Sequence, residues 1–166
     1  MAEKKLYFHS PSLGRQSLSQ VAQQIASFIK EEPGYYYRLV IGSDSQDYRS
    51  VADGYLNLVA AIVIYRQGRG GRYFWHKKRV AHSRSLREKI YKETLLSLAV
   101  AKKLLPLLRR RLNGDEYELE IHIDVGDVGP TREMIKEVVA MVNGNGFKAK
   151  TKPASYGASS VADRYT

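Results

Sequence analysis

The sequence predicts an α/β protein built on one mixed sheet with helices packed against it. Strand patterns rich in aromatic and β-branched residues alternate with amphipathic helix patterns over most of the chain. The first three strands follow one another through short polar connections, which is typical of an antiparallel meander. Each of the last two strands follows a helix, and right-handed crossovers would place them parallel to the first strand. We therefore expect five strands, three in the meander and two parallel, with an extra N-terminal helix.

Length and composition narrow the class of protein. With 166 residues we expect one domain over residues 1–166. The net charge of +10 favours a polyanionic partner, nucleic acid before an anionic membrane surface. No apolar stretch approaches the roughly 20 residues that cross a bilayer, and the first residues lack the apolar region of a signal peptide. Because cysteine is absent, we expect a cytoplasmic location and no disulfide-linked partner; nothing indicates the oligomeric state.

The N-terminal part is predicted to form a turn and one helix before the first strand. Residues 1–16 look irregular or briefly extended, with a turn at residues 10–14. Ser17 to Gln20 fits a capping box, and apolar residues keep helical spacing from there to Ile29. The run at residues 35–46 then predicts a largely buried strand whose carboxyl end carries Asp44.

The remaining elements follow from the same signals. A glycine-rich turn at residues 67–71 joins two strands into a hairpin, and a long helical pattern begins at Ser83 or Ser85. Pro106 inside that pattern predicts a kink or an early end. The expected elements after the first strand are strands at 55–65 and 72–81, a helix to Arg111, a strand at 118–124, a helix from Gly129-Pro130-Thr131 to Asn143-Gly144, a strand at 147–151, and a terminal helix capped by Ser159 or Ser160.

Four acids have positions suited to a shared site. Asp44 and Asp124 each end a strand, and ligands collect at the carboxyl ends of strands in open sheets. For either residue alone, the alternative is a turn or a helix cap. Glu93 lies on the inward stripe of the long helix, where a buried carboxylate needs a partner. Asp163 lies near the chain end, and its alternative is a solvated tail.

Several motifs carry a resemblance to a known family. They are Ser10-Pro11-Ser12-Leu13-Gly14, Ile41-Gly42-Ser43-Asp44-Ser45-Gln46, Glu120-Ile121-His122-Ile123-Asp124-Val125-Gly126 and Val161-Ala162-Asp163-Arg164-Tyr165-Thr166. With the order of elements, they resemble the ribonuclease H-like superfamily and, more closely, the YkuK-like family of bacterial ribonuclease H-like proteins, over about residues 8–166.

The resemblance implies a ribonuclease H-like fold with the four acids in the places of the superfamily's metal ligands. It implies two Mg²⁺ or Mn²⁺ ions and a nuclease or related phosphodiester hydrolase. Two divalent ions need hard oxygen ligands of this kind, and four carboxylates balance their charge. The alternative is a non-catalytic nucleic-acid-binding module on the same fold.

Residues beside the four acids qualify this expectation. Proofreading-type exonucleases of the superfamily carry Asp-x-Glu on the first strand, whereas Asp44 is followed by Ser45 and Gln46, which disfavours an exonuclease. Asp127 is either an outer ligand or a turn residue. His122 shares a strand face with Asp124, where it assists proton transfer or product release, or else belongs to the core.

The hairpin is the predicted nucleic-acid-binding element. Its basic residues alternate with aromatic ones, as on surfaces that bind single strands and hybrids. The alternative is a solvated hairpin whose aromatic rings pack into the core. The sequence does not distinguish RNA, DNA or a hybrid as partner. The candidate contacts are Arg66, Arg69, Arg72, Trp75, Lys77, Lys78 and Arg79.

Overall fold

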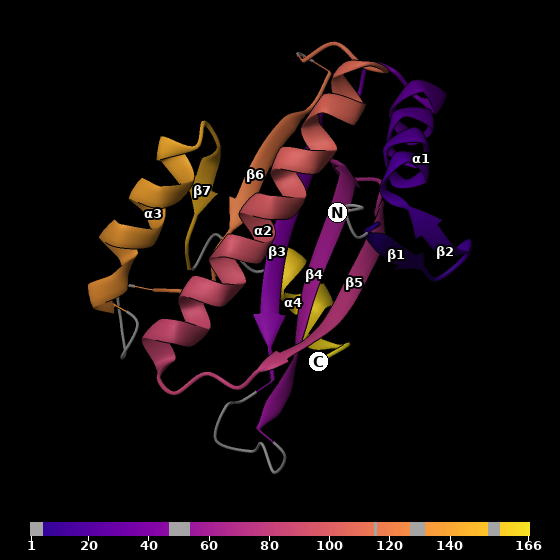
Figure 1. Cartoon of the computed structure of the whole chain (residues 1–166). Helices are drawn as coiled ribbons and strands as arrows, with labels where there is room; N and C mark the ends of the chain where they lie inside the picture. Colours follow the sequence, from indigo (N-terminus) through magenta and orange to yellow (C-terminus); the bar gives the residue numbers. More distant parts are fainter. Residues whose placement is uncertain (1–4, 47–53, 115, 127–131, 153–156) are drawn as a thin grey trace.

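The computed structural model describes residues 5–46, 54–114, 116–126, 132–152 and 157–166 (Figure 1). Within them, one sheet has the strand order β2-β1-β5-β4-β3-β6-β7. The strands are β1 (Tyr7–Ser10), β2 (Gly14–Ser17), β3 (Tyr37–Ser45), β4 (Tyr55–Arg66), β5 (Gly71–Ala81), β6 (Glu118–His122) and β7 (Lys148–Lys150). The helices are α1 (Leu18–Glu31), α2 (Leu86–Arg109), the 3₁₀ turn η2 (Arg132–Met134), α3 (Ile135–Gly144) and α4 (Gly157–Asp163).

The sheet has seven strands in the described residues, so the predicted number of five is wrong. The two additional strands are β1 and β2, an antiparallel hairpin in the segment expected to be irregular. Gly14 closes its turn at φ 68, and His9 pairs with Trp75 to attach the hairpin to β5. Strands of four residues are too short to show a periodic pattern, so only the pairing of β2 with β1 and of β1 with β5 reveals them.

The central part of the sheet follows the predicted arrangement. Strands β3, β4 and β5 form the antiparallel meander. Strand β6 lies parallel beside β3, and β7 lies parallel beside β6. Helix α2 makes the crossover from β5 to β6 (Figure 1). The carboxyl ends of β3 and β6 therefore meet at one edge of the sheet.

Helices cover the two faces of the sheet unequally. Residues of α1, α2 and α3 form the main core with one face, where Leu39 and Ile41 of β3 point. Helix α4 covers part of the opposite face and packs its two alanines, Ala158 and Ala162, on a smaller cluster that contains Val40 (Figure 1). Because strand residues alternate between faces, β3 contributes to both cores.

The helix boundaries confirm some sequence signals and correct others. Ser17 and Gln20 form the predicted capping box of α1, and Ser85 rather than Ser83 caps α2. Helix α2 continues past Pro106 to Arg109, so it does not end early at the proline, and only three helical residues follow it. Strand β6 ends two residues earlier than expected, so Asp124 stands in the segment that follows it.

The C-terminal elements also differ slightly from the sequence prediction. Helix α4 begins at Gly157, so Ser159 and Ser160 lie inside it rather than at its cap. The residues predicted to open the preceding helix, 129–131, lie outside the described part. In that described part, no helix combines the length and the apolar character needed to span a bilayer.

Candidate functional site

The four predicted acids come from four separate elements. Asp44 lies near the end of β3, on the face that α4 covers, and Asp163 is the last residue of α4. The side chains of Asp44 and Asp163 form a hydrogen bond, and Asp44 interacts electrostatically with Glu93 of α2. Glu93 interacts in turn with Asp124. The structure thus brings together, at one sheet edge, all four acids that the sequence proposed.

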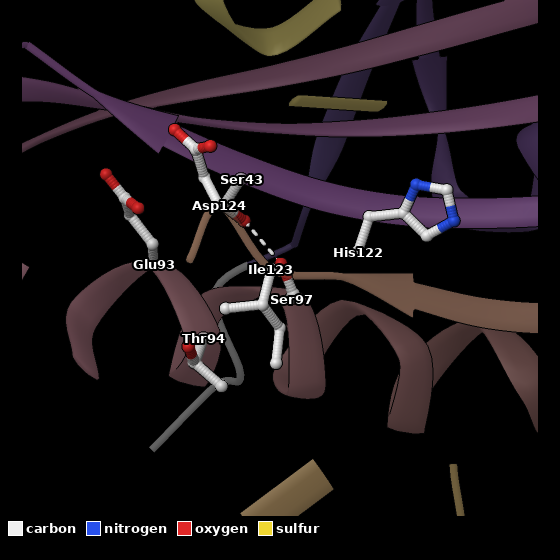
Figure 2. A pocket seen from close by; sticks show the side chains of 7 residues that line it. All are labelled: Ser43, Glu93, Thr94, Ser97, His122, Ile123 and Asp124. Carbon is white, nitrogen blue, oxygen red and sulfur yellow. Dashed lines mark hydrogen bonds between the residues drawn. The ribbon is translucent and has the colours of Figure 1, made fainter. Parts of the chain in front are cut away.

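Figure 2 shows a small pocket where two of these acids meet, with Glu93 and Asp124 extending to the same side. Ser43 and Ser97 form a hydrogen bond of 2.7 Å across it, which joins β3 to α2. The pocket has no room for a water molecule. It therefore marks the junction between the sheet and α2.

Glu93 is held rigidly by the strand that it faces. Its side chain is buried, and its Oε1 accepts hydrogen bonds from the Ser45 backbone N–H at 3.0 Å and the Ser45 hydroxyl at 2.7 Å. Burial raises the pKa of Glu93, although Lys89 and Ser45 oppose this. Glu88, five residues earlier, is exposed and accepts a hydrogen bond from the Arg84 backbone N–H at 2.7 Å. The helical phase that placed Glu93 on the inward stripe of the long helix is therefore right.

The carboxyl group of Asp44 is strongly perturbed by its surroundings. Burial, the neighbouring charge of Glu93 and the hydrogen bond with Asp163 together raise the pKa of Asp44 to about 7, although Lys89 lowers it. Like charges gathered in a partly buried site favour the protonated form of one member. Such perturbation is common at functional sites and rare on ordinary surfaces.

Lys89 is a member of the cluster that the sequence prediction missed. Its Nζ lies 2.5 Å from Glu93 Oε1 and 3.6 Å from Asp44 Oδ1, and it also interacts with Asp124. Only 15% of its side chain is exposed. It precedes Glu93 by one helical turn, so the phase argument that placed Glu93 inward applies to it too.

Lys152 is a second cation at the cluster, and its side chain is exposed. Its Nζ lies 2.6 Å from Asp124 Oδ1. The backbone around Asp124 is fixed against β7, because Ile123 N–H donates to Lys150 O at 2.9 Å and Lys152 N–H donates to Val125 O at 2.8 Å. Asp124 is thereby held in place although it follows the end of β6.

The donor chemistry of the four acids fits a hard divalent cation, which prefers carboxylate oxygens. In the described part of the chain, however, no three Asp, Glu or His side chains are arranged closely enough to hold a metal ion as they stand. The ammonium of Lys89 lies between Glu93 and Asp44, where it balances their charge.

The other residues proposed beside the acids have structural partners. Gln46 pairs with Asn57 through its backbone N–H at 3.0 Å, which extends the β3–β4 ladder. His122 is buried, and its Nε2 lies 3.0 Å from Glu120 Oε2. Burial lowers the pKa of His122, and its Nδ1 has no hydrogen-bond partner in the described residues. In Figure 2 its ring lies apart from the two carboxylates. Asp127 lies outside the described residues.

Three of the basic residues predicted to contact nucleic acid lie around the hairpin tip, where they contact aromatic residues. Arg66 is buried, and its Nη2 donates to Phe28 O at 2.7 Å. Arg69 donates to the Tyr35 hydroxyl at 2.9 Å, and Arg72 lies over the Phe28 ring. Arg66 thus holds α1 against the sheet. We therefore leave it out of the surface proposed to bind nucleic acid.

The register of the sheet separates the hairpin tip from the acids. Asp44 and Lys77 both pair with Val59, so they lie at the same level on the same face, two strands apart. Arg72 lies at the level of Leu39, five residues before Asp44. At about 3.4 Å per residue, this is a displacement of about 17 Å along the strand.

The remaining hairpin residues divide between the two faces. Trp75 stacks on His9 and on Tyr165, with ring centroids 4.6 Å and 4.1 Å apart, so its ring takes part in packing of the C-terminal segment. Lys78 and Arg79 are exposed; Arg79 shares the face of Lys77, whereas Lys78 points to the other. The basic residues beside the acids are therefore Lys77 and Arg79.

Comparison with known proteins agrees with the resemblance carried by the motifs. The chain is similar to a protein of Bacillus subtilis (strain 168) named "Uncharacterized protein YkuK", with 32% identity over 169 residues that cover 96% of each chain. No solved structure matches. A family profile described as Ribonuclease H-like matches residues 20–166, which include all four acids. This chain therefore belongs to the ribonuclease H-like family.

Proposed function

We propose that the protein is a divalent-metal-dependent phosphodiester hydrolase that acts on nucleic acid. The observation that carries the proposal is the convergence of Asp44, Glu93, Asp124 and Asp163 from four elements at one sheet edge. Membership of the ribonuclease H-like family supports a nucleic-acid-related role. The basic charge of the chain supports the same class of substrate.

The cluster is poorly explained as a stabilising feature. Burial and the neighbouring Glu93 both disfavour an ionised Asp44, whose pKa is raised to about 7. A protein gains nothing in stability from gathering such acids, because each ionisation opposes the next. Hard cations, in contrast, require carboxylates brought together in this way.

Each acid would have a defined part. Glu93 is oriented by Ser45, and Asp124 is oriented by the backbone pairing with β7. Asp44 and Asp163 face each other from β3 and α4. Two bound Mg²⁺ or Mn²⁺ ions would supply stabilisation of the attacking water and the leaving oxygen in a phosphodiester displacement.

The substrate would lie over the α4 side of the sheet edge. Lys77 and Arg79 are exposed there, and the Arg79 guanidinium lies 5.0 Å from the centre of the exposed Tyr55 ring. Such residues contact phosphates and position the polymer without reading its sequence. We expect the phosphate beside Lys77 to lie about two strand spacings, roughly 10 Å, from Asp44.

One observation favours a second candidate function. The ammonium of Lys89 already balances Glu93 and Asp44, as a permanent counterion would in a nucleic-acid-binding module without chemistry. The two functions differ in what metal does. A module would bind nucleic acid equally with or without divalent ions.

The test compares cleavage and binding in two variants. Labelled RNA, DNA and RNA–DNA hybrid are incubated with the protein in Mg²⁺, Mn²⁺ or chelator. We expect metal-dependent cleavage that Asp44→Asn abolishes, because the amide is a neutral ligand. Glu88→Gln is the matched control, since Glu88 is exposed and turned away from the cluster. Binding without cleavage of any of the three substrates would support the second function instead.

A further inference from the structure

Lys89 occupies an unusual position for a lysine. Its side chain is largely buried, and its Nζ contacts acids of two elements, Glu93 on α2 and Asp44 on β3. Lys92, one turn away, shows the ordinary behaviour: its Nζ lies 3.2 Å from the exposed Glu88 and donates to Ala81 O at 2.8 Å. Lysine is strongly hydrated, so turning it inward requires compensating negative charge.

Glu93 does not require Lys89 for hydrogen bonding. Its Oε1 already accepts from the Ser45 backbone N–H and hydroxyl, so the ammonium is a third donor to one oxygen. The role left for Lys89 is electrostatic. It places one positive charge among Glu93, Asp44 and Asp124, and these acids raise its pKa although burial lowers it.

We infer that Lys89 is a built-in competitor for the divalent cation, and that the ion binds only when the Lys89 side chain leaves the acid cluster. The inference rests on the proposed function, because it assumes that these acids bind metal. An ammonium and a metal ion at the same carboxylate oxygens repel each other and exclude each other sterically. It also accounts for the spacing of the acids, which are arranged around an ammonium rather than close enough to hold an ion.

The competition makes metal binding a switch. Without metal, Lys89 lowers the repulsion among the acids and keeps the edge of the sheet folded. With metal, the flexible four-carbon side chain swings toward solvent, which it can do from the second turn of α2 without moving the helix. Metal affinity is then weakened by the energy needed to release Lys89.

The test measures Mn²⁺ affinity, with no substrate, from the electron paramagnetic resonance signal of free Mn²⁺. Lys89→Met removes the charge and keeps the length of the side chain. We expect this variant to bind Mn²⁺ about tenfold more tightly than the wild type, a factor of the size typical of coupled binding equilibria. Lys92→Met should bind as the wild type does, because Lys92 lies outside the cluster.

Lys89→Arg guards against effects on folding, because it keeps the positive charge. If Lys89→Arg binds Mn²⁺ as weakly as the wild type and Lys89→Met binds it more tightly, the result supports the competition. Equal affinities of wild type and Lys89→Met overturn it and leave the proposed metal site intact. Absence of Mn²⁺ binding in both the wild type and Lys89→Met overturns the competition and the proposed metal site together. Binding in Lys89→Met alone supports a lysine that blocks the site.

Discussion

Asp44→Asn should stabilise the metal-free protein, and the gain should grow with pH. The pKa of Asp44 is raised from 3.8 to about 7, so the folded state holds a proton that the unfolded state releases. A raised pKa of this kind contributes stability that is present below pH 3.8 and lost as pH rises through 7. Asp44→Asn has no carboxyl group to ionise at this position, so it does not lose this stability as pH rises.

The size of the loss in the free energy of unfolding follows from the pH range between the two pKa values. Each pH unit between the two pKa values contributes about 1.4 kcal/mol, so from pH 5 to pH 8 the wild type should lose at most about 2.7 kcal/mol relative to Asp44→Asn. Only 13% of the Asp44 side chain is exposed, so solvent screening reduces this little. Sharing of the proton with Glu93 spreads the effect over the pair, and we expect a change of about 1–2.5 kcal/mol.

The assay is urea unfolding of both proteins in chelator at pH 5, 6, 7 and 8, with the slope m checked for constancy. Glu88→Gln is the control: hydrogen bonds from the Arg84 backbone N–H and Lys92 lower the pKa of Glu88, so its removal cannot give a gain that grows with pH. A difference between wild type and Asp44→Asn that is the same at pH 5 and pH 8 would refute the raised pKa of Asp44 in the folded protein.

Two further predictions concern metal and nucleic acid. Saturating Mn²⁺ should stabilise the wild type by about 2.7 kcal/mol at a hundredfold excess over Kd. Glu93→Gln should lose most of that gain and Glu88→Gln none, as measured by melting temperature; equal losses would place the ligand elsewhere. Lys77→Ala should reduce the slope of log K against log [salt] for duplex binding by about 0.9, the value of one phosphate contact. Arg69→Ala, at the distant hairpin tip, should leave the slope unchanged, and the opposite result would move the interface to the tip.

The main features of the site follow from local sequence alone. A β-branched run that stops at small polar residues predicts a buried strand with Asp44 at its end, and the structure has that strand as β3. Helical phase is equally local, since an angle of about 100° per residue decides that Glu93 rather than Glu88 points inward. The order of the strands from β3 to β7 follows from short connections and right-handed crossovers.

Other features depend on contacts between distant segments. The four-residue strands β1 and β2 have too few residues for a periodic pattern, and they form by pairing with each other and, through β1, with β5. Arg66 sits in a hairpin that looks solvated, yet its guanidinium packs 4.0 Å from the centre of the Phe28 ring of α1. Arg72 and Lys77 belong to one strand of the hairpin yet lie at levels about 17 Å apart, because an extended strand carries each residue about 3.4 Å further.

The state of the acid cluster was decided by tertiary structure only. A carboxylate's pKa depends on how much water and charge surround it, and for Asp44 these come from α2 and α4 rather than from its own strand. The same holds for Lys89. Its position on the inner face of α2 could be read from its spacing to Glu93, but whether its long side chain turns inward depends on the negative charge that β3 and the segment after β6 place beside it.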